Sequence, residues 1–145
     1  MGSESSSDMN NGLEAKASTT INAPASKVWD ALVDPHKIKQ YMFGTDVTSD
    51  FKVGSPITWK GEFKGKAYED KGEIKRLTPG RLLQYTHASG AKPDDVHTVT
   101  IELSGNNGTT NVRLTQDNNA NEKAKQESEK NWSTMLAGLK KVVER

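Results

Sequence analysis

Apolar and polar residues alternate in six segments of the chain, as they do in strands that bury one face. In residues 56–63, for example, Ile57, Trp59 and Phe63 share one face and polar residues occupy most of the other. The pairs Pro79-Gly80 and Asn107-Gly108 are turn sequences between such segments. We therefore predict an antiparallel sheet with one apolar face, with strands at about residues 13–22, 49–63, 68–78, 81–87, 96–104 and 109–116.

Two other regions have the spacing of helices. Residues 119–144 carry a single apolar stripe among charged residues, which predicts one long helix. Residues 24–43 predict two short helices, because the residue before a proline avoids the α region and Asp34-Pro35 interrupts the pattern. A sheet with one apolar face needs a cover. We expect the long helix to lie across its concave side, the bent pair to close the remaining opening, and His36 to be an ordinary surface residue.

Composition narrows the class of protein. The chain has 145 residues, a net charge of +1 with both signs interspersed, and no cysteine. This length suits one domain, placed at residues 13–145 after a Ser/Asn-rich tail at 1–12 that we expect to be disordered. No clustered basic stripe indicates nucleic-acid binding, and no apolar run reaches the roughly 20 residues that span a bilayer. We expect a cytoplasmic protein that binds neither nucleic acid nor membrane.

Several segments resemble a known family in the right order. The segment INAPASKVWDALVDPHKIKQYM, at residues 21–42, is similar to the opening of the START-like (SRPBCC) superfamily, and more narrowly of the activator of heat-shock-protein-90 ATPase homologue-like family. Residues 52–63, 71–87 and 131–144 resemble later segments, although Gly54-Ser55 stands where the family usually has Gly-Gly. The resemblance spans about residues 14–145. It implies an α+β helix-grip fold, birch-allergen-like, in which a curved antiparallel sheet wraps around a long C-terminal helix and two short helices follow the first strand.

The resemblance also implies a cavity, because in the helix-grip fold the long helix stands off the sheet. Gly61 and Gly72 are expected to deepen this cavity, and methionines allow its wall to repack around different guests. Tyr85, or Arg113 if its strand parity is reversed, could orient a ligand. The candidate ligand-binding residues are Met42, Phe43, Trp59, Phe63, Tyr85, His87, His97, Trp132, Met135, Leu136 and Leu139.

Two histidines are the candidate polar pair. If strands 82–87 and 97–103 are neighbours, His87 and His97 lie near each other at the rim of the inward face, where they could hydrogen-bond a ligand or share a metal. The alternative is that they are two strand-end residues beside a loop. Without a nearby carboxylate or third ligand they make an incomplete zinc site. We therefore expect no metal, no cofactor and no catalytic residue.

Three functions stay open at this point. The first is a module that binds a small apolar molecule in the cavity. The second is a protein that acts on a chaperone through its surface, as the resemblance implies. The third is a cavity enzyme, for which His87 and His97 are the candidate acid and base. The chain has no Walker, G-x-S-x-G or H-E-x-x-H motif, and we favour the first function.

Overall fold

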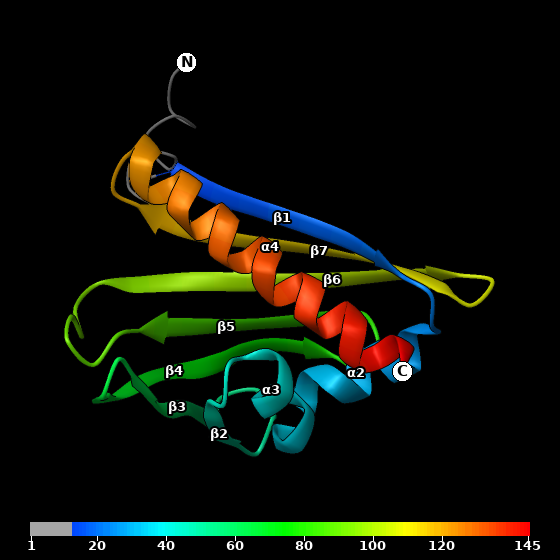
Figure 1. Ribbon diagram of the computed structural model, residues 1–145, viewed down its shortest axis with the longest axis horizontal. Helices are drawn as coiled ribbons and strands as arrows, with labels where there is room; N and C mark the ends of the chain where they lie inside the picture. Colours follow the sequence, from blue (N-terminus) through cyan, green and yellow to red (C-terminus); the bar gives the residue numbers. More distant parts are fainter. Residues whose placement is uncertain (1–12) are drawn as a thin grey trace.

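The computed structural model describes residues 13–145, except for the side chain of Asn106. The predicted disordered tail at residues 1–12 lies outside the described residues. A single sheet of seven antiparallel strands forms most of the molecule (Figure 1), in the order β1-β7-β6-β5-β4-β3-β2. The strands are β1 (Leu13–Ile21), β2 (Asp46–Ser49), β3 (Pro56–Phe63), β4 (Lys66–Thr78), β5 (Leu82–Ala88), β6 (Val96–Asn106) and β7 (Thr109–Asn119).

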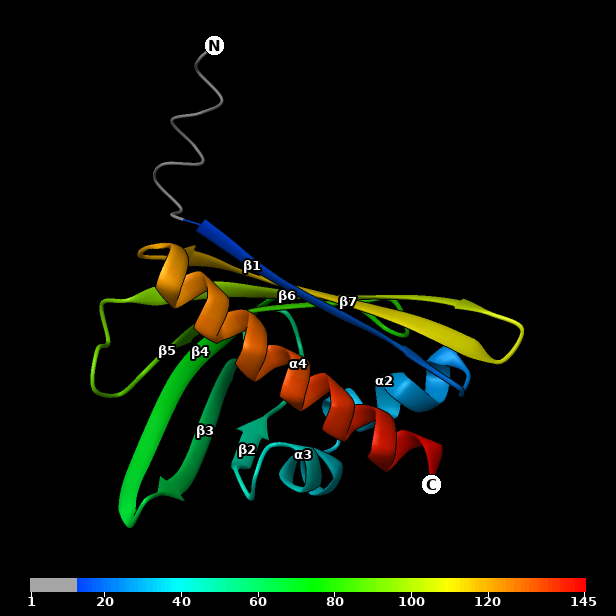
Figure 2. The same cartoon turned by 45° about the horizontal axis from the view of Figure 1, so that its top comes forward.

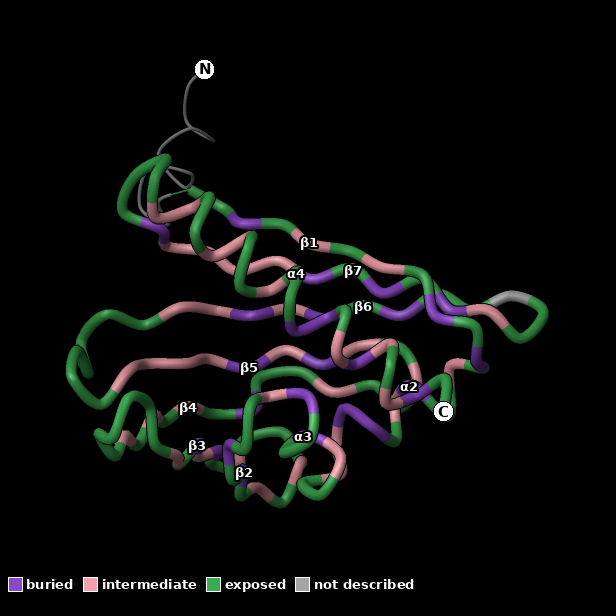
Figure 3. The backbone as a smooth tube through the Cα atoms, in the orientation of Figure 1, coloured by how far each residue is buried: buried purple, intermediate pink, exposed green. Residues whose placement is uncertain are grey.

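The sheet curves around one long helix, α4 (Glu122–Glu144), which crosses its concave face (Figure 2). The inner side chains of the strands and the apolar stripe of α4 form the core, and Figure 3 shows buried positions concentrated there. On α4 the buried side chains are Met135, Leu136, Leu139 and Val143. This confirms the predicted helix-grip fold. The four-residue strand β2 was not predicted, because Val47 is its single apolar residue.

The two short helices are α2 (Ala25–Val33) and α3 (Pro35–Tyr41), and the predicted break lies between them. Asp34 has an extended backbone, and its carboxylate accepts a hydrogen bond from the backbone N–H of His36 at 2.9 Å, which caps α3. Pro35 has no N–H, so the carbonyl of Ala31, four residues earlier, lacks its helical donor. The buried Tyr41 hydroxyl donates to that carbonyl at 2.9 Å instead. This hydrogen bond joins α3 to the end of α2 and holds the bend.

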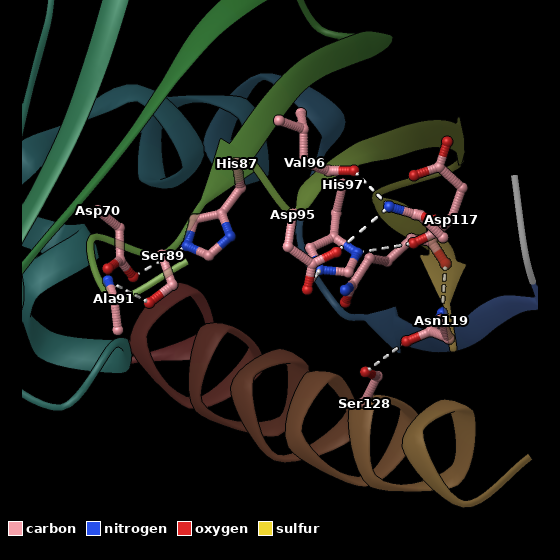
Figure 4. Close-up of polar contacts among 12 residues, drawn as sticks. Asp70, His87, Ser89, Ala91, Asp95, Val96, His97, Asp117, Asn119 and Ser128 are labelled. Atoms are coloured by element: carbon pink, nitrogen blue, oxygen red, sulfur yellow. Dashed lines mark hydrogen bonds and ion pairs between the residues drawn. The ribbon is translucent and has the colours of Figure 1, made fainter. Parts of the chain in front are cut away.

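Hydrogen bonds join the first turns of α4 to both β1 and β7. Asn119, which is buried, donates from Nδ2 to the carbonyls of Leu13 (2.8 Å) and Gln116 (3.0 Å). Its Oδ1 accepts from the Ser128 hydroxyl at 2.8 Å (Figure 4). Asn121 caps the helix by accepting from the N–H of Ala124 at 2.8 Å. The helix therefore begins at residue 122 rather than at the predicted 119, because β7 continues through Asn119.

None of the helices within residues 13–145 has the combined length and apolarity needed to cross a membrane.

Candidate functional site

A cavity of about 240 Å³ lies where α4 passes over the β3–β5 side of the sheet. It reaches the surface, because the lining residues Phe43 and Asn131 are exposed. Larger surface hollows of about 500 Å³ occur elsewhere, but charged and polar side chains from strand ends make up much of their lining. The 240 Å³ cavity is lined by Met42, Phe43, Thr45, Trp59, Tyr68, Asp70, Tyr85, His87, Asn131, Trp132 and Met135.

Three ring side chains from two strands form the floor of the cavity. Trp59 projects from β3, and Tyr85 and His87 project two residues apart from β5, so all three face α4. The Trp59 and Tyr85 rings lie 5.3 Å apart between centroids, and the His87 ring meets Trp59 edge-on at 4.9 Å. Burial raises the pKa of Tyr85 far above its ordinary value, so its phenol is neutral at physiological pH.

The two glycines that were expected to deepen the cavity have other roles. Gly61 lies opposite Tyr68 in the β3–β4 register, and a Cβ at Gly61 would collide with the Tyr68 ring. The missing side chain therefore makes room for an aromatic residue that lines the cavity. A Cβ at Gly72 would overlap with the Thr86 carbonyl, so this glycine permits close approach of β4 and β5 near a bulge. The expectation that these glycines add cavity volume was wrong.

Polar groups gather at one side of this apolar space. The Thr45 and Tyr68 hydroxyls are 2.6 Å apart and share a hydrogen bond. Asp70, two residues after Tyr68 on the same face of β4, accepts a hydrogen bond from Nε2 of His87 at 2.9 Å (Figure 4). The second Asp70 oxygen accepts from the backbone N–H of Gly90 at 3.2 Å. The Asp70 side chain is 19% exposed and the His87 side chain 32%, so this hydrogen bond is partly shielded from solvent.

The two histidines are neighbours, as the sequence predicted, but their surroundings differ. His87 and His97 are direct partners in the β5–β6 register. Nδ1 of His97 donates to the backbone carbonyl of Asp117 at 2.9 Å, its Nε2 lies 3.6 Å from an oxygen of Asp95, and His97 does not line the cavity. The expectation that no carboxylate is near was wrong, since each histidine has one. Within residues 13–145, no group of three metal-ligating side chains of the His, Asp and Glu types is arranged to hold an ion.

The structure places seven of the eleven predicted residues on the cavity wall: Met42, Phe43, Trp59, Tyr85, His87, Trp132 and Met135. Leu136 and Leu139 are fully buried in the core instead, and Phe63 is 67% exposed at the end of β3. Arg113 is exposed on β7, between the buried Val112 and Leu114, and does not face the cavity.

Four lining residues were not predicted: Thr45, Tyr68, Asp70 and Asn131. The alternation of β4 could have found two of them, because Tyr68 and Asp70 share parity with the buried Ile74. No pattern in the sequence indicates that Thr45, after α3, and Asn131, on the polar side of the α4 stripe, meet at this place.

A curved antiparallel sheet that grips a long C-terminal helix and encloses an aromatic cavity defines a START-like domain of the helix-grip type. More narrowly, the chain belongs to the family described as activator of Hsp90 ATPase homolog 1-like protein, whose model matches residues 22–144. No match was found among the curated proteins.

Solved structures are similar over most of the chain. The solution structure of ChR145 from Cytophaga hutchinsonii is 55% identical, with a TM-score of 0.80, and the match covers 92% of this chain and 95% of that one. The Aha1 dimer from Colwellia psychrerythraea is 23% identical, with a TM-score of 0.73 and coverage of 92% and 97%. CalU16 from Micromonospora echinospora is also 23% identical, with a TM-score of 0.71 and coverage of 87% and 73%. The last two support the fold alone.

Proposed function

We propose that this protein binds a small, mostly apolar molecule in the cavity between β3, β4, β5, α3 and α4. The observation that carries the proposal is a surface-connected space of about 240 Å³ whose wall is mainly aromatic and methionine side chains. Binding pockets for small molecules typically combine such a wall with a few polar groups that orient the ligand. Here the Thr45–Tyr68 hydroxyls and the Asp70–His87 pair supply those groups.

The volume suggests the size of the ligand. A cavity of about 150 Å³ in a protein core accommodates benzene, so this one suits a ligand of about one or two rings. A second space of about 20 Å³ lies deeper, and Met42 and Met135 border both spaces. Methionine side chains change rotamer readily. The cavity can therefore extend inward when a longer ligand pushes these two side chains aside.

Binding can be tested with 6-propionyl-2-(dimethylamino)naphthalene (prodan), a two-ring dye whose fluorescence rises in an apolar site. Asn131 and Ser133 are both exposed, neutral residues of α4, but Asn131 lines the cavity and Ser133 does not. Asn131→Trp should cover the opening and weaken probe binding about tenfold or more, about 1.4 kcal/mol. Ser133→Trp is the matched control and should bind like the unmodified protein. Absence of binding by the unmodified protein, or equal binding by both variants, would count against the proposal. Native mass spectrometry of freshly purified protein would then identify any ligand carried through purification.

The family match favours a second candidate function, stimulation of a chaperone ATPase. Such a function would use the outer surface of the domain. Asn131→Trp, which covers the cavity opening, should therefore leave the stimulation of the ATPase unchanged. The test is the ATPase rate of the Hsp90 of the same organism with increasing amounts of this protein. A rate that is unchanged at saturating protein removes this candidate.

A further inference from the structure

We propose that His87, positioned by Asp70, is a general base that removes a proton from a molecule held in the cavity. This inference rests on the proposed ligand binding and adds a reaction to it. It assigns to the site a substrate class, small apolar β,γ-unsaturated carbonyl compounds with an acidic C–H between the carbonyl and the C=C bond. Asp70 acts only through His87, and we therefore treat it as a positioning residue.

The hydrogen bonds determine which nitrogen of His87 is basic. Nε2 lies 2.9 Å from the Asp70 carboxylate, which can only accept, so Nε2 carries the proton in the neutral ring. The lone pair is then on Nδ1, which has no hydrogen-bond partner among residues 13–145. Figure 4 shows the ring projecting from β5 toward α4, on the side where the cavity lies. A histidine held in one tautomer by a carboxylate is the arrangement that general-base catalysis requires.

Two contacts fix the orientation of the ring. The Asp70 carboxylate is itself held by the N–H of Gly90, and Trp59 packs edge-on against the imidazole. When Nδ1 takes up a proton, Nε2–H still donates to the Asp70 carboxylate, so the ring keeps its orientation. His97 offers a useful contrast: its Nδ1–H is tied to a backbone carbonyl and the residue does not border the cavity.

A hydrogen-bond donor for the developing negative charge is present on the same wall. Thr45 and Tyr68 share one hydrogen bond, so one of their two O–H groups is left to donate to a ligand. Tyr68 and Asp70 are two residues apart on β4 and both side chains face the cavity. A ligand can therefore meet the base and the hydroxyl pair at once, on a wall that is otherwise mainly apolar.

The proposed step balances without any further reactant. Nδ1 of His87 takes the proton from the carbon beside the carbonyl, and the C–H electron pair becomes the C=C bond of an enolate. The carbonyl π pair moves to oxygen, where a hydroxyl of the Thr45–Tyr68 pair stabilises the charge. The imidazolium, hydrogen-bonded to Asp70, then returns the proton to another carbon of the conjugated system. The net reaction is an isomerisation, with no oxidation or reduction.

The test uses 5-nitrobenzisoxazole, an apolar probe of the right size. A base removes its ring C–H proton, the N–O bond breaks, and the coloured product 2-cyano-4-nitrophenolate forms. We expect the unmodified protein to accelerate this elimination beyond an equal concentration of free imidazole. Deuterium at the reacting carbon should slow the reaction, because the C–H bond breaks in the step that His87 catalyses.

The variants separate a catalytic role from a structural one. His87→Gln should lower kcat for the elimination about a hundredfold. Asp70→Asn should lower kcat by less and leave binding of the probe unchanged, because it alters the tautomer and orientation of the base rather than the cavity wall. His97→Gln is the matched control on the neighbouring strand and should retain the rate. Asp70→Asn also keeps the test decisive if His87→Gln fails to fold.

Binding of prodan, measured on the same samples, distinguishes the two proposals. Binding without elimination by the unmodified protein, or elimination that survives His87→Gln, overturns the general-base role and leaves the ligand-binding function standing. Absence of both binding and elimination overturns both proposals.

Discussion

Shortening a side chain that borders the cavity should cost less stability than shortening one in the solid core. Met135 and Leu139 lie one turn apart on the apolar stripe of α4 and are 4% and 0% exposed. They differ in what surrounds them. Met135 borders both the 240 Å³ cavity and the 20 Å³ space beneath it, whereas Leu139 borders neither.

The two alanine variants therefore lose different amounts of packing. Leu139→Ala removes a fully enclosed side chain and leaves a void that its neighbours cannot close, which costs about 3–5 kcal/mol. Met135→Ala loses the transfer free energy of its side chain, about 2–3 kcal/mol, but the vacated volume joins a cavity that already reaches solvent. We expect the free energy of unfolding to differ between the variants by about 1–2 kcal/mol.

Equilibrium unfolding in urea measures both values, provided that the slope with denaturant is unchanged. Met135→Ala should also accept bulkier apolar probes than the unmodified protein, and Leu139→Ala should not. Equal destabilisation by the two substitutions, together with an unchanged choice of probes, would show that no cavity lies next to Met135 and would refute the reasoning.

Three further predictions concern the surrounding framework. Tyr41→Phe should cost about 1–3 kcal/mol in urea unfolding, because the Ala31 carbonyl loses its hydroxyl donor and no amide can replace it. Burial raises the pKa values of Tyr41 and Tyr85 above the ordinary 10.0, so the unfolded chain ionises these phenols at lower pH than the folded protein does. The free energy of unfolding is therefore at its full value below pH 10 and falls at higher pH. Tyr85→Phe should make this fall smaller in urea unfolding measured from pH 9 to about 11. Gly72→Ala should destabilise by about 1–3 kcal/mol or more, since its methyl group would overlap with the Thr86 carbonyl, and a melting temperature equal to that of the unmodified protein would contradict this.

The parts of the fold that follow from neighbouring residues could be predicted. Asp34-Pro35 ends one helix and caps the next through residues that adjoin in sequence. Asn107 and Gly108 form the β6–β7 turn with φ values of 53° and 81°, which their residue types allow. The pairing of His87 with His97 also followed, because a loop of fixed length between two alternating strands sets the register.

The polar side of the cavity could not be predicted in the same way. The bulge between Ile74 and Arg76 lies between the β4–β5 turn and the Asp70–His87 contact, and it shifts the register by an amount that alternation does not reveal. Phe63 shares parity with Trp59 yet is exposed, because parity says which face a residue occupies and not whether another element covers that face. Both failures concern contacts between segments whose relative position depends on the whole fold.

The bend between α2 and α3 accounts for the cavity on the β3–β5 side of α4. The helix packs directly on β1 and β7 at one edge of the sheet, while at the other edge α3 lies between α4 and β2. In this position α3 holds α4 away from β3, β4 and β5. The rings of Trp59, Tyr85 and Trp132 line the space between them without filling it. The Tyr41 hydroxyl fixes the position of α3 by donating a hydrogen bond to the Ala31 carbonyl, which Pro35 leaves without a helical donor. The same proline that interrupts a helix therefore helps to set the spacing between sheet and helix that leaves this cavity open.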